Sequence, residues 1–419
     1  MKKIFLICIL LVSYIFAKDL TLEVVKEVGK KPLISVEDSS PAFSDRLNKK
    51  FFKLLVADLK VTSHFNVDEK YNYSNFDSSF DFSKYKNNNL VVRYELNYDD
   101  YANLIAKVKL FNMKTDEIAY QKIYKIRGSK RYPFLAHKIV CDINDFIGAP
   151  SVDWMRRFVI FSKYTKPRNA DIVVSDYTLT YQKTIIQGGL NVFPKWGDKD
   201  QKTFYYTAYE KKPTLYRVNL YTGKRAKVLS SEGMIVCSDV SKDGKKLLIT
   251  MAPNFQPDIY VYNLLTKTLK RVTKYKGIDV NGNFIENDKR VVFVSDRLGY
   301  PNIFAKSIDG IGVERLVYHG KNNSSCSAYG NYIVYSSRES NNEFGKNIFN
   351  LYLISTKSDY IRRLTATGVN QFPRFSIDGE SILFIKHLKN QSALGIIRLN
   401  YNKSYLYPLK VGKIQSIDW

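Results

Sequence analysis

Cysteine is scarce in this 419-residue chain, and its scarcity limits the chemistry that the sequence can support. Cys8 lies in an apolar run at the N-terminus, which leaves Cys141, Cys237 and Cys326 for the rest of the chain. Three widely spaced thiols provide no disulfide framework and no Cys-x-x-Cys pair for a metal or redox site. We expect all three to be buried side chains in an apolar core.

Histidine is as scarce as cysteine, and no catalytic motif accompanies its four residues. The sequence contains no Gly-x-Ser-x-Gly turn, no phosphate-binding loop, no Gly-x-Gly-x-x-Gly fingerprint and no His-Glu-x-x-His pair. Asp296 and Arg297 follow a strand-like segment, and we interpret them as turn formers with a surface ion pair rather than as catalytic groups. These absences predict a protein without catalytic activity, cofactor or metal.

Acidic residues are in the minority, because 65 Lys and Arg oppose 40 Asp and Glu for a formal net charge of +25. A basic chain suggests an acidic partner such as nucleic acid, anionic lipid, or an acidic protein or polymer. The cations are scattered, without the clusters and stacking aromatics of a nucleic-acid site. We therefore interpret the charge as a solvated basic surface and expect no nucleic-acid partner.

Long apolar runs are also missing, since a comfortable membrane span needs about 20 apolar residues. The apolar run of residues 4–16 is shorter, follows Met1-Lys2-Lys3 and precedes the small residue Ala17. This pattern predicts a secretory signal peptide over residues 1–17, and hence an exported protein that does not span a membrane. An uncleaved N-terminal anchor is the alternative.

The next part of the chain divides into a short lead and a small domain. Residues 18–31 are polar and β-branched and are predicted to form a mobile arm. Residues 32–150 contain a helical pattern that starts near Ser44 and a second one that opens at Pro133 and ends at Gly148. The strand candidates are residues 33–36, 90–96, 103–111 and 117–126. We therefore predict an α+β domain with a mostly antiparallel sheet and two helices.

From residue 158 onward, helical spacing gives way to a repeat of about 44 residues. Each unit has an opening strand, a tight turn such as Asp243-Gly244, and three further strands. The equivalent opening positions are Pro194, Ser238, Gly282, Ser325, Pro373 and Ile417.

The last residues of the chain, 414–419, repeat only the opening of a unit, whereas residues 158–187 lack that opening. The last strand therefore completes the first unit and closes a ring. This predicts an all-β six-bladed β-propeller over residues 151–419, closed by a C-terminal strand. A β-sandwich with coincidental spacing is the alternative.

Strand order would place the Asx-Gly turns on one face of the ring and the longer, variable loops on the other. Variable loops on a rigid scaffold are the usual place for recognition, so we predict binding on the loop face. A ring also brings distant side chains together in its central channel, where a metal site remains the less favoured alternative.

Together these features resemble the TolB family of the Tol-Pal system, over nearly the whole mature chain. The repeat motif is matched by NVFPKW, SKDGKK and NQFPRFSIDGES, and a family helix by RYPFLAHKIVCDINDFIG. SDRLGYPNIF is similar to the family's SDxxGxPxxY loop. The sequence departs from the family in its fifth unit, which lacks the proline and aromatic opening, and at Ile417, where proline is expected.

The resemblance implies a non-catalytic periplasmic protein that links the peptidoglycan-associated lipoprotein Pal to the inner-membrane protein TolA. Such a protein maintains outer-membrane integrity and invagination during cell division. We expect a monomer near the peptidoglycan, with other outer-membrane proteins as further candidate partners. The alternatives are a propeller enzyme, such as a lyase, or a binding module acting on periplasmic polysaccharide or peptidoglycan.

Loop position and the resemblance together suggest contact residues for both partners. The predicted Pal-facing residues are Arg297, Tyr300, Asn302, Arg338 and Glu339. The predicted TolA-contacting residues of the arm are Leu20, Leu22, Val24 and Val25. The arm residues alternate in a way that would add a strand to the edge of a partner sheet.

Overall fold

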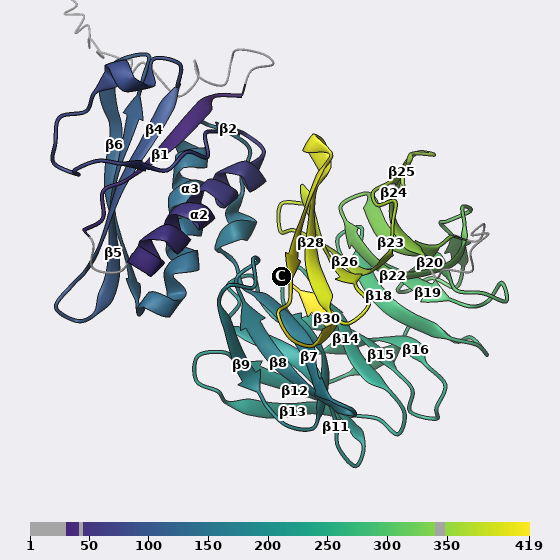
Figure 1. The fold of residues 1–419 in the computed structure, drawn as a ribbon. Helices are drawn as coiled ribbons and strands as arrows, with labels where there is room; N and C mark the ends of the chain where they lie inside the picture. The colour runs from purple at the N-terminus through teal and green to yellow at the C-terminus, as the bar shows by residue number, and fades with distance from the viewer. Residues whose placement is uncertain (1–30, 42–44, 340–347) are drawn as a thin grey trace, which may run out of the picture.

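The computed structural model describes residues 31–41, 45–339 and 348–419 (Figure 1). The predicted signal peptide and the arm residues Leu20, Leu22, Val24 and Val25 lie outside these described residues. Within the described part, no helix combines the length and apolarity needed to cross a membrane. Cys141, Cys237 and Cys326 are buried free thiols, as predicted.

A mixed sheet and two helices form the N-terminal domain (Figure 1). Its elements are β1 (Leu33–Asp38), α2 (Asp45–Thr62), β2 (Asn66–Val67), β3 (Asn72–Tyr73), β4 (Leu90–Tyr98), β5 (Asn103–Asn112), β6 (Glu117–Arg127) and α3 (Tyr132–Phe146). The strand order is β2-β1-β4-β5-β6, with β3 also beside β1. β1 runs parallel to β2, β3 and β4, and only β4, β5 and β6 pair antiparallel. Most paired residues are antiparallel, as predicted, but the parallel pairing of β1 was not predicted. It arises because the crossover through α2 returns the chain in the direction of β1.

The two helices cover one face of this sheet and lie between the sheet and the propeller (Figure 1). α3 begins with Pro133 in its first turn, where the missing N–H costs nothing. It buries Leu135, Ile139 and Ile143, which recur at helical spacing. The helix ends before Gly148, whose φ of 64° is a conformation that glycine adopts without strain.

Antiparallel pairing divides the propeller strands into six four-stranded blades, and single parallel residue pairs link the first blade to the second and the fifth to the sixth. The propeller confirms the predicted fold class, and the pairing is consistent with the predicted six blades. The first three blades are β30 (Lys413–Asp418), β7 (Val159–Lys166), β8 (Asn169–Ser175) and β9 (Gln182–Ile186); β10 (Leu190–Trp196), β11 (Thr203–Tyr209), β12 (Pro213–Asn219) and β13 (Arg225–Ser230); and β14 (Ile235–Val240), β15 (Lys246–Met251), β16 (Asp258–Asn263) and β17 (Leu269–Arg271).

The last three blades follow the same order from the channel outward. They are β18 (Asp279–Ile285), β19 (Arg290–Ser295), β20 (Asn302–Ser307) and β21 (Val313–Arg315); β22 (Lys321–Tyr329), β23 (Tyr332–Arg338), β24 (Phe349–Ser355) and β25 (Ile361–Arg363); and β26 (Val369–Phe375), β27 (Ser381–His387), β28 (Ser392–Arg398) and β29 (Lys403–Pro408). Apolar residues of neighbouring blades pack together between the sheets, so each blade needs its neighbours to bury both faces.

The ring closes where the C-terminal strand β30 pairs antiparallel with β7, placing Ile417 opposite Phe161. The inner strands share an irregularity in register at equivalent places. In three of them a residue with positive φ, such as Phe193 or Phe372, precedes the predicted opening position. In the fifth blade the residue with positive φ is Ser325 itself, so Cys326 rather than Ser325 is the equivalent position. The alignment was one residue off because this blade has no proline or aromatic residue to anchor it.

Candidate functional site

The loop face consists of the loops that join the second and third strands of each blade, together with those that join successive blades. Arg297 lies in the loop between β19 and β20, but its side chain turns back onto the blade. Its guanidinium donates two hydrogen bonds of 3.1 Å to Asp279 and lies over the rings of Tyr275 and Phe304. The side chain is only 19% exposed, so Arg297 mainly anchors its loop.

Two further predicted contact residues also support the scaffold. Asn302 is fully buried, and its side-chain oxygen accepts a hydrogen bond from Asn323 at 3.0 Å. Because a fully buried side chain offers no surface to a partner, the prediction for Asn302 is corrected. Glu339 is half-buried and accepts hydrogen bonds from the side chains of Asn350 and Tyr352. Of the predicted set, the half-buried Tyr300 and the exposed Arg338 remain surface candidates.

Apolar side chains that the sequence analysis did not single out stand on the same face. Phe255, Ile278 and Leu298 are 78%, 47% and 41% exposed and come from three neighbouring loops. The backbone N–H of Ile278 donates to a carboxylate oxygen of Asp296 at 2.7 Å, and the side chain of Gln256 donates to a backbone carbonyl of the same loop region. These bonds tie the loops into one surface. The isolated Phe255 between the polar residues of its loop was the available sequence signal.

Phe255 is also strained, because its φ of 60° is a conformation that aromatic residues rarely adopt. Such a backbone costs on the order of 1–3 kcal/mol and is held only where the surroundings impose it. Strain and exposure coincide at this residue, which makes the apolar loop surface the strongest recognition candidate on this face.

The channel contains a ring of six polar side chains, one from the same position of each inner strand. The ring consists of Lys195, Asp239, Asn283, Ser327, Arg374 and Asp418. Lys195 lies 3.0 Å from Asp418 and 3.6 Å from Asp239, and Arg374 lies 3.9 Å from Asp418. Five of these positions directly follow the irregularity in their strands, and Asp418 lies two residues beyond the irregularity in β30. A correct alignment of the openings would therefore have revealed the ring.

Donors and acceptors alternate around this ring. Asp239 accepts a hydrogen bond from the backbone N–H of Phe284 at 2.9 Å, and Asp418 accepts one from that of Trp196 at 2.8 Å. Both bonds reach the following blade, so the ring fastens blades to one another. Burial lowers the pKa of Lys195, but the carboxylates of Asp418 and Asp239 outweigh it and hold that pKa above its usual value.

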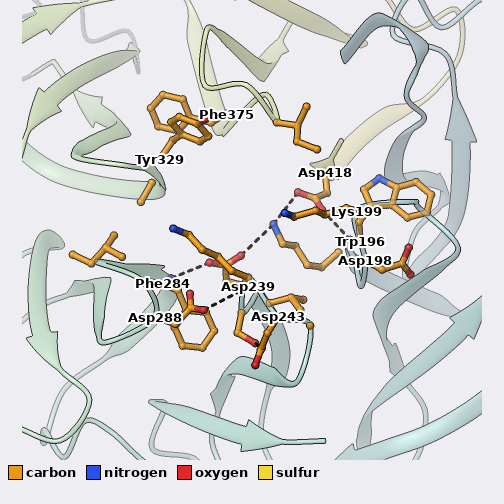
Figure 2. Close-up of a pocket in the computed structure, with 18 of the residues that line it drawn as sticks. Trp196, Asp198, Lys199, Asp239, Asp243, Phe284, Asp288, Tyr329, Phe375 and Asp418 are labelled. Atoms are coloured by element: carbon orange, nitrogen blue, oxygen red, sulfur yellow. Dashed lines mark hydrogen bonds and ion pairs between the residues drawn. The ribbon is translucent and has the colours of Figure 1, made fainter. Parts of the chain in front are cut away.

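The channel opens on the turn face, the side of the Asx-Gly turns, into a hollow of about 910 Å³ (Figure 2). We call it the turn-face hollow. Its charged lining residues are Arg157, Lys195, Lys199, Lys242, Asp198, Asp239, Asp243, Glu286, Asp288 and Asp418. Among the described residues, no group of three or more His, Cys, Asp or Glu side chains is arranged to hold a metal.

A buried polar cluster joins the N-terminal domain to the propeller. His137 of α3 lies with Nδ1 2.7 Å from Asp58 of α2 and Nε2 3.4 Å from Asp176, which follows β8. The hydroxyl of Tyr177 donates to Asp58, and all four side chains are fully buried. Burial lowers the pKa of His137, but the two carboxylates raise it overall, to about 9. The cluster has no access to solvent, so it serves domain docking rather than catalysis.

Comparison with known proteins agrees with this architecture. A family described as "TolB beta propeller domain" matches residues 155–419. A Tol-Pal system protein TolB from Wolinella succinogenes is 55% identical over 412 residues and covers 97% of both chains. One from Helicobacter hepaticus is 47% identical over 423 residues and covers 100% of both. Both relatives are named as proteins of the Tol-Pal system.

A solved structure extends the agreement to the fold. The crystal structure of TolB from Acinetobacter baumannii matches with a TM-score of 0.73 at 20% identity and covers 93% of this chain and 96% of that one. The family match over the propeller and the high identity over the full length lead to one conclusion. The chain belongs to the TolB family of Tol-Pal system proteins.

Proposed function

We propose that this protein is the periplasmic adaptor of its Tol-Pal system and links the lipoprotein Pal to the inner-membrane protein TolA. In this role it maintains outer-membrane integrity and invagination during cell division, acting as a monomer. The observation that best supports an adaptor is the apolar loop surface of Phe255, Ile278 and Leu298 on a closed ring.

Pal binds the loop face in this proposal. Large apolar side chains that stand out from a rigid surface are typical binding hot spots. Hydrogen bonds between the loops hold these side chains in place before binding, so little conformational entropy is lost when the partner docks. Tyr300 and Arg338 flank the surface as polar contacts, whereas Arg297 and Glu339 position the loops.

TolA binds the N-terminal arm in this proposal. The alternating residues Leu20, Leu22, Val24 and Val25 support it, because an extended segment of this kind adds to the edge of a partner sheet. The predicted signal peptide over residues 1–17 supports a periplasmic location.

The test is biolayer interferometry of the mature chain, from Lys18, with the soluble domain of Pal from the same organism. We expect saturable binding and a loss of at least tenfold in affinity for the double variant Phe255→Ala/Leu298→Ala. Ile311→Ala is the matched control, because Ile311 is 99% exposed but lies outside the loop face. Unchanged Pal affinity of the double variant would contradict the proposed surface.

The arm is tested separately with the soluble domain of TolA. A chain that begins at Lys31 should lose TolA binding and retain Pal binding, because the two surfaces are distinct. Equal TolA binding by both chains would refute the role of the arm. Binding of either chain to purified cell wall in the absence of Pal would favour the alternative of a peptidoglycan-binding module, to which the net charge of +25 is suited.

A further inference from the structure

We propose that the turn-face hollow binds an extended peptide segment in which lysine or arginine side chains alternate with apolar ones. The hollow lies on the opposite face from the proposed Pal surface, so this inference does not depend on the proposed function. Its volume of about 910 Å³ accommodates several amino-acid residues.

Two chemically different walls face each other across the hollow (Figure 2). On one side Asp243 and Asp288 stand on the turns of the third and fourth blades. On the other side Tyr329 and Phe375 belong to the fifth and sixth blades, next to the exposed Ile377. A ligand that fills the hollow therefore meets carboxylates with one edge and apolar surface with the other.

The acidic wall is available to a ligand. Asp243 accepts hydrogen bonds from Ser241 and Lys245 through Oδ1, and Asp288 accepts one from the backbone of Lys242 through Oδ2. In the described part of the chain, the other oxygen of each carboxylate has no hydrogen bond. The hydrogen bond from Ser241 lowers the pKa of Asp243, so this carboxylate is ionised at neutral pH.

The position of the carboxylates in the lining also favours a cationic ligand. Six carboxylates and four cations line the hollow, although the whole chain has a net charge of +25. Lys195 is paired with Asp418 and Asp239, and Glu286 with Arg290, which leaves Asp198, Asp243 and Asp288 beside Arg157, Lys199 and Lys242. Two of the three remaining carboxylates, Asp243 and Asp288, belong to the acidic wall. Local acidity on a basic protein attracts cationic groups of a partner and repels anionic ones.

Trp196 lies in the lining of the hollow and is 5% exposed. Its indole N–H is shielded from solvent and has no hydrogen-bond partner among the described residues. The indole therefore lies close enough to the hollow to report binding, although it is not itself a contact of the ligand.

The apolar wall is held in position by the close packing of Tyr329. A Cβ added at Gly379 would lie 2.2 Å from the Tyr329 ring, so this ring occupies the space that a larger residue would fill. Tyr329 remains 42% exposed and offers one ring face to a ligand. An aromatic face fits both the stems of lysine side chains and their cationic ends.

The test uses the indole N–H groups of the mature chain as reporters in ¹⁵N-edited NMR. Trp196 and Trp419 line the hollow, and the sequence has only three tryptophans. The probes are the peptide acetyl-Lys-Leu-Lys-Val-Lys-amide and its counterpart with glutamate in place of lysine. We expect saturable shifts of the Trp196 signal, assigned with Trp196→Phe, with the cationic peptide and none with the acidic one.

Variants then test the two walls. The double variant Asp243→Asn/Asp288→Asn keeps side chains of the same shape with a hydrogen-bonding oxygen. It should lower the affinity for the cationic peptide by roughly tenfold. Tyr329→Ala should lower the affinity for this peptide as well. Asp359→Asn is the control, because Asp359 is exposed but does not line the hollow. Circular dichroism establishes that each variant folds.

Three outcomes with the peptides would overturn the inference. They are the absence of a saturable shift with the cationic peptide, equal binding of the acidic peptide, and unchanged affinity of the Asp243→Asn/Asp288→Asn variant. A stronger response to N-acetylglucosamine oligomers than to the cationic peptide would also overturn it, because it would identify a carbohydrate site.

Discussion

Lys195 and Asp418 are 223 positions apart in the sequence, yet their side chains form an ion pair of 3.0 Å in the channel. Lys195 belongs to β10 of the second blade, and Asp418 to β30, the strand that closes the ring. The same carboxylate accepts the backbone N–H of Trp196, so one side chain joins the closing strand to the next blade twice.

Removal of the Asp418 charge should therefore destabilise the ring. In Asp418→Asn, Lys195 keeps only Asp239, which lies 3.6 Å away. We expect the free energy of unfolding in urea to fall by about 2 kcal/mol, because a buried ammonium loses its nearest partner. Asp309→Asn, which breaks the exposed pair with Lys270, should lower the free energy of unfolding much less, because solvent screens an exposed pair. Equal losses in the two variants would show that the channel pair does not fasten the ring.

The docking of the two domains should depend on pH through His137. Its pKa is about 9 in the folded protein, against the ordinary histidine pKa of 6.5 in the unfolded chain. A raised pKa contributes stability that is complete below pH 6.5 and is lost as the pH rises toward 9, in total about 3 kcal/mol. In urea unfolding from pH 6.5 to 9, the loss of stability should be smaller in His137→Gln than in the parent chain. A parallel pH dependence of the two proteins would contradict the charged cluster.

The second interface histidine, His64, should act in the opposite direction. Burial lowers its pKa to about 4, and its side chain contacts Asn144 and, at 2.7 Å, Tyr401 of the propeller. A depressed pKa means that the unfolded chain binds the proton first, so stability falls as the pH drops from 6.5 toward 4. His64→Gln should show a shallower acid limb than the parent chain. An unchanged acid limb would indicate that His64 is protonated in the folded protein.

Variants of Arg297 and Arg338 test which of these two residues stabilises the folded propeller. Its partner Asp279 is fully buried, so Arg297→Ala leaves a carboxylate without its cation. We expect a loss of about 3 kcal/mol in the free energy of unfolding. Arg338→Ala, at an exposed position of the same face, should stay within about 0.5 kcal/mol. Thermal unfolding of both variants measures this, and equal stability would mean that Arg297 is not an anchor.

Two glycines of the Asx-Gly turns offer a matched comparison. Gly244 and Gly379 have φ values of 71° and 76°, so alanine is strained at both. The Cβ would meet nothing within 4 Å at Gly244 but would meet the Tyr329 ring at Gly379. We expect Gly244→Ala to cost about 1 kcal/mol and Gly379→Ala to cost more, because the ring must move. Equal costs in chemical unfolding would show that Tyr329 moves aside freely.

The fold could be predicted from the sequence more fully than the candidate site. Repeat spacing and the incomplete unit at residues 414–419 were sufficient for the closed ring, because a blade has a fixed order of strands. The parallel pairing of β1 was missed, since β2 and β3 are two-residue strands without a periodic signal. Asn302 looked like an exposed loop residue because it follows a turn, and only the packed structure shows its burial.

The polar ring of the channel was missed for a related reason. Its members differ chemically, from Lys195 to Ser327, so only their equivalent positions relate them. Those positions emerge once the register of each inner strand is known. The turn-face hollow depends in the same way on side chains from all six blades, a proximity that no local pattern reports.

Closure by β30 also determines when the ring can form during synthesis of the chain. β7 lies at the start of the propeller, but its inner neighbour β30 is synthesised after every other propeller strand. Until it arrives, the chain is an open arc with unpaired strand edges, and pairing of such distant segments is slow. A chain that stops short of residue 413 therefore lacks the strand that closes the ring. This segment is not a dispensable tail. Closure of the ring therefore reports that synthesis has passed residue 413.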